Sequence, residues 1–182
     1  KGPCTCSRCV YQGAESRGCK NPRMPTRSPS ILSVDPQGPD ACALLAEAAL
    51  DARALYPELF SPDSPPPRNE ALGARSVYLL SYVDARALAS GALRPCEALG
   101  EDCAELRRMY VHRDHRRQGL ARQMLQALIA EARRLGYRRL VLETGYKQRP
   151  AMALYEAHGF QRIEPFGRYI DDPSSVCFEL GL

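Results

Sequence analysis

The 182-residue sequence lacks several features that would each define a class of protein. It has no apolar run of about eighteen residues, the least that a membrane-spanning helix needs, and no charged segment precedes an apolar stretch near its start. Its three histidines, His112, His115 and His158, have no metal-ligand spacing. No serine or cysteine nucleophile stands beside a local base. We therefore expect a soluble, cytoplasmic protein whose chemistry needs neither a metal nor a nucleophilic triad.

Positive charge is unevenly distributed along the chain. Of the 25 basic and 21 acidic residues, five basic residues and one acidic residue lie in residues 1–23, which leaves 20 of each sign in the remainder. The net charge of +4 therefore belongs to the N-terminal segment. No aromatic residues interleave with the basic residues elsewhere, as a nucleic-acid stacking surface would require. The composition argues against a nucleic-acid partner.

Four of the eight cysteines are crowded into the same N-terminal segment. Residues 1–29 are poor in apolar side chains and rich in Gly, Pro, Ser and basic residues, which predicts a disordered tail ahead of one domain over residues 30–182. The alternative is a zinc site, because Cys6-x-x-Cys9 has the spacing of a zinc knuckle. Its four ligands would be Cys4, Cys6, Cys9 and Cys19. No second C-x-x-C accompanies them, so we expect no metal there.

Hydrophobic periodicity divides residues 30–182 into strands and helices. Apolar residues recur at helical spacing after Asp40, and we expect Asp40 to cap this first helix. The same spacing predicts a second helix over residues 119–135, with Gly136 as its C-terminal cap. A third helix has Pro150 in its first turn. Strand patterns cover residues 31–34, 77–83, 87–93, 103–112, 140–142, 160–165 and 175–181. A strand, the second helix and a short buried strand follow one another, which predicts a βαβ unit.

The basic turn from His115 to Ala121 is the most informative segment of the chain. It lies between a strand that ends at Val111 and the predicted helix over residues 119–135. Backbone N–H groups at the start of a helix have no intrahelical acceptor, and the helix dipole favours negative charge there. Four cationic side chains surround the turn: Arg113, His115, Arg116 and Arg117. The segment therefore predicts a binding site for a phosphate-bearing ligand.

Two motifs carry a family resemblance. Arg116-x-x-Gly119-x-Ala121 is similar to the R/Q-x-x-G-x-G/A signature of the GNAT superfamily of N-acetyltransferases, and the segment from Ala151 to Phe160 resembles that superfamily's A-x-x-L-Y-E/K-x-x-G-F sequence. The resemblance, to small bacterial members above all, implies an α/β (α+β) fold with a mixed central β-sheet, helices on both faces and a central βαβ unit. It also implies transfer of an acetyl group from acetyl-CoA, as co-substrate, to a primary amine of a small molecule or peptide by direct attack. Many members form homodimers.

The resemblance also implies roles for individual residues. Tyr155 matches the general acid that protonates the leaving sulfur, and Glu105 matches the general base of several members. The alternative for Glu105 is an ion pair with Arg107 or Arg108. The residues that would bind acetyl-CoA are Met109, through its backbone N–H, Val111, Arg116, Arg117, Gln118, Gly119, Leu120, Ala121 and Gln148. Gln148 stands where many members have a CoA-contacting Asn.

Other positions depart from the family pattern or leave alternatives open. Arg117 replaces a frequent Gly, so its side chain either crowds the pyrophosphate or pairs with it. Ala85 replaces the usual hairpin Gly, which predicts a different turn. Residues 56–69 either help to form the amine site or simply connect two elements. Regular alternation places Glu105 and Met109 on one face of their strand, unless a β-bulge resets the pattern.

A different class of function also fits these motifs. A non-catalytic acyl-CoA-binding regulatory module would keep the phosphate turn but would not need Glu105 or Tyr155. Replacing Tyr155 by Phe discriminates the two hypotheses, because it changes a rate only in an enzyme.

Overall fold

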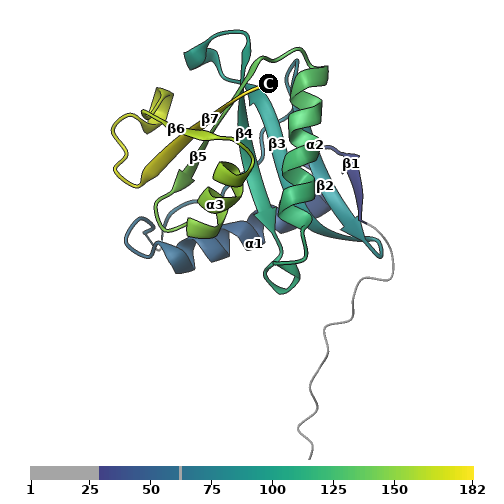
Figure 1. The fold of residues 1–182 in the computed structure, drawn as a ribbon. Coiled ribbons are helices and arrows are strands. Elements are labelled where there is room, and N and C mark those ends of the chain that lie inside the picture. The colour runs from purple at the N-terminus through teal and green to yellow at the C-terminus, as the bar shows by residue number, and fades with distance from the viewer. Residues whose placement is uncertain (1–28, 62) are drawn as a thin grey trace, which may run out of the picture.

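The computed structural model describes residues 29–61 and 63–182, and the predicted tail with its four cysteines lies outside them. In these ranges the chain forms seven strands, three α-helices and three short 3₁₀ turns (Figure 1). In order they are β1 (Ser30–Ser33), α1 (Pro39–Leu55), β2 (Val77–Val83), β3 (Arg86–Pro95), η1 (Glu97–Leu99), β4 (Cys103–Val111), η2 (Arg113–His115), α2 (Leu120–Arg134), β5 (Arg139–Gly145), α3 (Arg149–Ala157), β6 (Gln161–Ile163), η3 (Gly167–Tyr169) and β7 (Ser175–Gly181). No helix in these ranges is long and apolar enough to cross a membrane.

The seven strands form one mixed sheet in the order β1-β2-β3-β4-β5-β7-β6. Only β4 and β5 run parallel, and every other neighbouring pair is antiparallel. The parallel pair is joined through α2, as parallel strands need a crossover connection. The predicted mixed sheet with a central βαβ unit is therefore confirmed.

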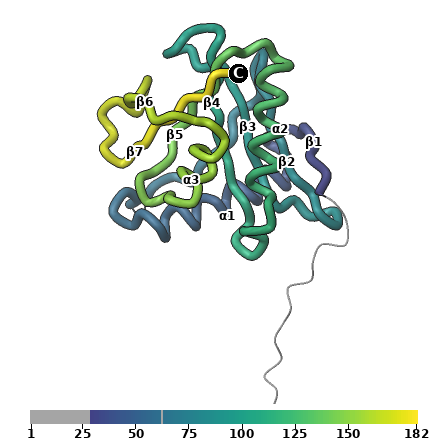
Figure 2. The backbone as a smooth tube through the Cα atoms, in the orientation of Figure 1, coloured from purple at the N-terminus to yellow at the C-terminus, as the bar shows by residue number. Residues whose placement is uncertain are grey.

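Helices cover both faces of the sheet, as β2 illustrates. Tyr78 and Leu80 pack with Ala41 and Leu44 of α1 on one face. The alternate residues, Val77 and Leu79, belong to the larger core cluster on the other face, with α2 and Tyr155 of α3. Figure 2 shows α2 and α3 running over the strands, while α1 passes along the lower part of the sheet. Both faces of β2 are buried, so its sequence reads as a nearly continuous apolar run.

Helix α2 has the predicted amphipathic pattern. Its fully buried residues recur at helical spacing, and Ile129 and Leu135 pack partly against the same core. Those buried residues are Leu120, Met124, Leu125, Leu128 and Ala132. Gly136 follows the helix with a φ of +78°, the left-handed conformation expected of a C-terminal cap. The buried face of α2, made mostly of Leu and Met side chains, is therefore part of the core.

The expected cap of α1 is wrong. Helix α1 begins at Pro39 with Gly38 as its N-cap, so Asp40 lies inside the first turn. Proline is favoured there because its missing N–H would have no intrahelical acceptor. Asp40 still stabilises the helix start through the dipole, and one of its carboxylate oxygens accepts a hydrogen bond from the hydroxyl of Tyr82 at 2.9 Å.

The β2–β3 hairpin also corrects an expectation. Val83 pairs with Arg86, so the turn has two residues, Asp84 and Ala85, with φ values of +48° and +63°. The different turn expected at Ala85 is wrong, because the alanine adopts the left-handed conformation that a glycine would adopt. Two-residue turns of this kind match the twist of the strands, which outweighs the steric cost at Ala85.

Replacement of Ala85 by Gly is therefore expected to stabilise the fold. An L-residue in the left-handed region costs about 1 kcal/mol, which glycine avoids. Urea denaturation should show a free energy of unfolding higher by roughly 0.5–1 kcal/mol. Ala74→Gly, at an exposed position without positive φ, is the control and should give no gain. An Ala85→Gly protein no more stable than the parent would contradict this account of the turn.

Candidate active site

The site begins where β4 and β5 separate. Their parallel pairing runs from Cys103↔Arg139 to Leu106↔Leu142 and then stops. Beyond that point β4 stays paired with β3 as far as Val111, and β5 stays paired with β7 as far as Gly145. The two strands follow different partners, so a gap opens in the middle of the sheet. The β5-facing edge of β4 is thereby left without a strand partner after Leu106.

A cavity of about 650 Å³ lies at this gap. Its lining comes from α1, the 57–69 loop, β4, β5 and α3. Leu59, Phe60, Ser64, Pro65 and Pro67 are the loop residues that line it. The loop is therefore part of the cavity wall, and it is more than a connector. Its prolines prevent a regular helix, and the Arg53 guanidinium holds it by donating a 2.7 Å hydrogen bond to the carbonyl of Ser64.

A bulge in β4 reorients the residues that face the cavity. Pairing with β3 shifts between Ser90 and Ala92, and Arg108 has a φ of +58°. The Ser90 hydroxyl donates a 2.8 Å hydrogen bond to the Arg108 carbonyl and so helps to hold the bulge. Met109 consequently packs into the α2-side core, beside Leu106, instead of sharing a face with Glu105. The regular alternation considered for Glu105 and Met109 does not hold, and the bulge is the physical reason.

Gly91 makes room for this bulge. A Cβ at residue 91 would lie 2.5 Å from the Leu128 Cδ1 atom and 3.1 Å from the Met109 sulfur. A side chain there would push the end of Leu128 aside and crowd the Met109 sulfur. The sequence showed no signal for this requirement, because it depends on three elements that meet only in the fold.

The basic turn has the form expected of an anion site. Strand β4 ends at Val111, η2 follows, and α2 begins at Leu120 after Gly119, whose φ is +83°. The N–H groups of Leu120, Ala121 and Arg122 occupy the first turn, where no intrahelical acceptor exists. The Leu120 side chain is buried and anchors the helix, so this residue offers only its backbone.

Arg117 adopts the left-handed backbone conformation that favours glycine, the residue that the family pattern often has at this position. Its φ is +61°, in the left-handed region, and its side chain is exposed. The backbone path of the turn is therefore preserved. Among the described residues, no carboxylate lies within ion-pair distance of Arg117, so its charge is available to a ligand.

Two other cations of the turn are already paired. Arg113 forms a 2.9 Å ion pair with Asp51 of α1, and Arg116 pairs with the other oxygen of the same carboxylate. The Arg116 Nε atom also donates to the Val111 carbonyl at 3.1 Å. In this arrangement Arg113 and Arg116 link the turn to α1.

Glu105 lies in a network of ion pairs and does not line the cavity. Its side chain is 5% exposed. Arg94 contacts one oxygen at 2.7 Å, and the Tyr169 hydroxyl donates to the other at 2.7 Å. Arg107 approaches at 3.6 Å, whereas Arg108 instead donates to the carbonyl of Arg68. This geometry favours the ion-pair alternative for Glu105, with Arg94 and Tyr169 as the main partners.

Glu143 is the carboxylate that does line the cavity, and sequence reasoning missed it. It is the first residue of β5 past the paired segment, beside the gap. Burial raises the pKa of Glu143, although the Ser175 hydroxyl donates to its carboxylate at 3.0 Å. Its position directly after the apolar run Leu140-Val141-Leu142, at the carboxyl end of a buried parallel strand, was the available signal.

Tyr155 and Gln148 line the same cavity from α3. The Tyr155 ring is buried against Phe160 and Phe178. Burial raises the pKa of Tyr155, and the nearby Glu143 carboxylate raises it further. Gln148 precedes the first turn of α3, and its carbonyl accepts from the Ala151 N–H at 3.0 Å. Met109, Tyr155, Gln148 and Glu143 therefore surround one space.

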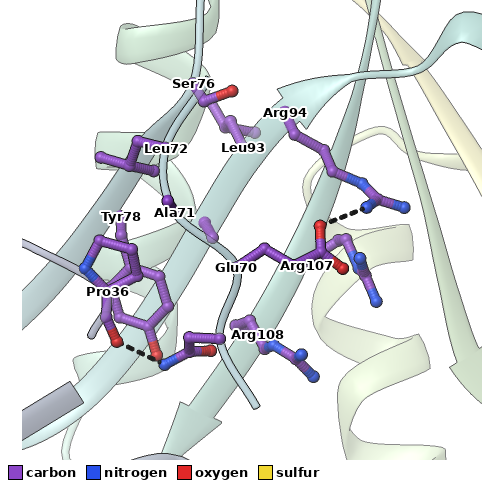
Figure 3. A pocket seen from close by; sticks show the side chains of 12 residues that line it. Pro36, Glu70, Ala71, Leu72, Ser76, Tyr78, Leu93, Arg94, Arg107 and Arg108 are labelled. Carbon is purple, nitrogen blue, oxygen red and sulfur yellow. Dashed lines mark hydrogen bonds and ion pairs between the residues drawn. The ribbon is translucent and has the colours of Figure 1, made fainter. Parts of the chain in front are cut away.

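A smaller hollow of about 60 Å³ shares Tyr78, Arg107 and Arg108 with the cavity (Figure 3). Its outer wall is the segment around Glu70, which reaches Arg94 in a 3.4 Å ion pair. The Asn69 amide fixes this segment by donating to the Pro36 carbonyl at 2.8 Å. The hollow therefore lies on the arginine-lined side of the larger cavity.

Comparisons with known proteins identify the family. The model of the acetyltransferase (GNAT) family matches residues 45–160. The uncharacterized N-acetyltransferase YsnE of Bacillus subtilis is 41% identical over 118 residues, which are 62% of this chain and 78% of YsnE. An IAA acetyltransferase of Azospirillum brasilense is 37% identical over 50% of this chain and 61% of its own length.

Solved structures share the fold. The crystal structure assigned as an acyl-CoA N-acyltransferase from Klebsiella pneumoniae is 33% identical, with a TM-score of 0.67 over 85% of this chain and 97% of that chain. A GNAT acetyltransferase from Elizabethkingia anophelis, solved with acetyl-CoA bound, has a TM-score of 0.59 at 16% identity over 85% of this chain and 98% of that chain, a likeness of fold alone.

The family match, the curated relatives and the shared fold place the chain among acetyl-CoA-dependent acyltransferases. The chain belongs to the GNAT acetyltransferase family, and its activity is acetyl-CoA-dependent N-acetyl transfer.

Proposed function

We propose that the chain transfers the acetyl group of acetyl-CoA to a primary amine by direct attack within the cavity between β4 and β5. The observation that carries this proposal is that one cavity holds a half-buried carboxylate, Glu143, and a buried phenol, Tyr155, beside the strand that leads into the basic turn. The pyrophosphate would bind the first-turn N–H groups of α2 with Arg117 and Gln118, beside Gly119. Gln148 would contact the pantetheine arm, and Val111 and Ala121 would border the entry.

Glu143 is proposed as the general base in place of Glu105. The amine nitrogen attacks the thioester carbonyl carbon, and its proton passes to Glu143. A carboxylate whose pKa is raised by burial is a better base toward an amine than an exposed one. Glu105, shared among several arginines, is proposed to position Arg107.

Met109 and Tyr155 complete the proposed reaction. The Met109 N–H would bind the carbonyl oxygen as it gains negative charge. The C–S bond then breaks, and Tyr155 gives its proton to the departing sulfur while it recovers one from Glu143. Burial keeps the Tyr155 phenol protonated at neutral pH, so its proton is available when the thiolate forms.

Calorimetric titration of the full chain with acetyl-CoA tests the cofactor site. We expect saturable binding with a micromolar Kd, about −8 kcal/mol. Ala121→Glu should weaken it at least about 100-fold, because a carboxylate in the first turn of α2 repels the phosphates. The same carboxylate complements the helix dipole, so the variant should remain folded.

The matched control for this titration is Ala130→Glu, on the exposed face of the same helix. It should bind acetyl-CoA like the parent chain. A parent chain that shows no binding, or an Ala121→Glu chain that binds equally well, would contradict the proposed site.

A further inference from the structure

Two opposite charges face each other across the gap between β4 and β5. Since Leu106 pairs with Leu142, the next residues, Arg107 and Glu143, are opposite one another where the strands separate. Both side chains line the cavity. Among the described residues, Arg107 has one carboxylate within ion-pair distance, that of Glu105. The Glu143 carboxylate has no cation of the described residues within this distance. The two charges therefore do not neutralise each other.

Positive charge is in excess on the Arg107 side. The one carboxylate near Arg107, Glu105, also has Arg94 at 2.7 Å and Arg168 at 3.8 Å. Burial lowers the pKa of Arg107, the Glu105 carboxylate raises it, and the neighbouring Arg94 and Arg168 lower it. A bound anion would relieve this repulsion. Arg107 is thus a cation on the cavity wall whose neutralisation is incomplete.

Further donors lie on the same side. The Arg108 guanidinium lines the cavity and donates to a backbone carbonyl, that of Arg68 at 2.9 Å. Tyr78 is 2% exposed, and no group among the described residues meets hydrogen-bond geometry with its hydroxyl. Burial raises the pKa of Tyr78, and the nearby Ser90 and Asn69 side chains lower it. Buried polar groups normally have partners, so an unpaired hydroxyl on a cavity wall points to a ligand.

The remaining wall is apolar. Leu59, Phe60, Pro65 and Pro67 line it from the loop, and Ala48, Ala49 and Ala52 line it from α1. Small side chains on α1 leave space opposite the loop. This wall suits an apolar substituent.

We propose that the acceptor is a free α-amino acid with an apolar side chain, its amino group at Glu143 and its carboxylate at Arg107. The proposal rests on the function proposed above and names the substrate of that site. Neighbouring strands lie about 4.8 Å apart and diverge here, so groups on one carbon atom can reach both residues. The amino nitrogen forms the new bond to the acetyl carbon, its proton passes to Glu143, and the carboxylate stays bound and unchanged.

The experiment compares matched acceptors with acetyl-CoA, with release of the CoA thiol as the readout. The acceptors are L-phenylalanine, its carboxamide and phenethylamine, and L-leucine with its carboxamide. We expect kcat/KM to be at least about tenfold higher for each acid, because a partly buried cation whose neutralisation stays incomplete disfavours the neutral analogue. Arg107→Gln should lower kcat/KM for the acids by about 100-fold and leave the carboxamides within about threefold.

Controls separate a loss of charge from a loss of fold. Arg107→Lys should recover part of the preference for the acids, and Arg133→Gln, on the exposed face of α2, should behave like the parent chain. Equal turnover of acids and carboxamides, or an Arg107→Gln variant that slows both alike, would overturn this proposal and leave the proposed N-acetyl transfer intact.

Absence of all turnover would count instead against the proposed function. The substrate class is then decided by binding: the chain saturated with CoA is titrated with N-acetyl-L-phenylalanine and with its carboxamide. Tighter binding of the acid, lost in Arg107→Gln, supports the carboxylate site. Equal binding, or none, overturns it.

Discussion

Replacement of Tyr155 by Phe is expected to lower kcat by about 10²–10³-fold while the Kd for acetyl-CoA stays within about twofold. The substitution removes one hydroxyl and keeps the ring that packs against Phe160 and Phe178. The core should therefore be preserved, and the proton donor for the leaving sulfur is lost. Steady-state thiol release and calorimetric binding measure the two quantities separately.

Tyr146→Phe is the matched control for this experiment. Tyr146 is exposed, and its hydroxyl donates to Glu58 at 3.0 Å, away from the residues that line the cavity. Its loss should leave kcat unchanged. If Tyr155→Phe also left kcat unchanged, Tyr155 would have no chemical role, and the proton for the leaving sulfur would have to come from another donor.

Replacement of Glu143 by Gln is expected to lower kcat/KM by about 10²–10⁴-fold. A general base must be ionised to accept the amine proton, and burial raises the pKa of Glu143 above its ordinary value of 4.5. Activity of the parent chain should therefore rise with pH as Glu143 ionises, and this rise should lie at a higher pH than for an exposed glutamate. The acidic limb should disappear from the residual activity of Glu143→Gln.

Glu105→Gln provides the comparison on the neighbouring strand. It removes the buried charge that Arg94 contacts at 2.7 Å, so we expect a loss of about 2 kcal/mol in the free energy of unfolding. The acidic limb should remain, since the proposed base is intact. If the acidic limb of the pH–activity profile persisted in Glu143→Gln and disappeared in Glu105→Gln, Glu105 would be the general base.

The two glutamates illustrate which parts of the site the sequence reveals. Glu105 was singled out through family resemblance on β4, and the fold surrounds it with arginines and with Tyr169, 64 residues away. Glu143 directly follows the apolar run of β5, so its position was visible in the sequence. Its exposure to the cavity depends on where β5 leaves β4, and nothing in the local pattern encodes that point.

The phosphate turn shows a similar division. Its place between β4 and α2 followed from the order of apolar strand, basic turn and amphipathic helix. The pairing of Arg113 and Arg116 with Asp51 did not, because Asp51 lies 65 residues from Arg116 on a helix that packs against the other face of the sheet. The spacing of a motif predicts an anion site, but not which of its cations are already paired.

The sequence by itself determined the elements, the central βαβ unit and the family, because periodicity, Gly136, Pro150 and the two motifs are local properties of the chain. Tertiary structure decided the rest: the gap after Leu106 and Leu142, the bulge that turns Met109 over, and the loop and arginines that close the cavity. These features arise where segments distant in sequence pack against one another. Strands β4 and β5 separate because each continues pairing with a different neighbour, and the space between them is the proposed site.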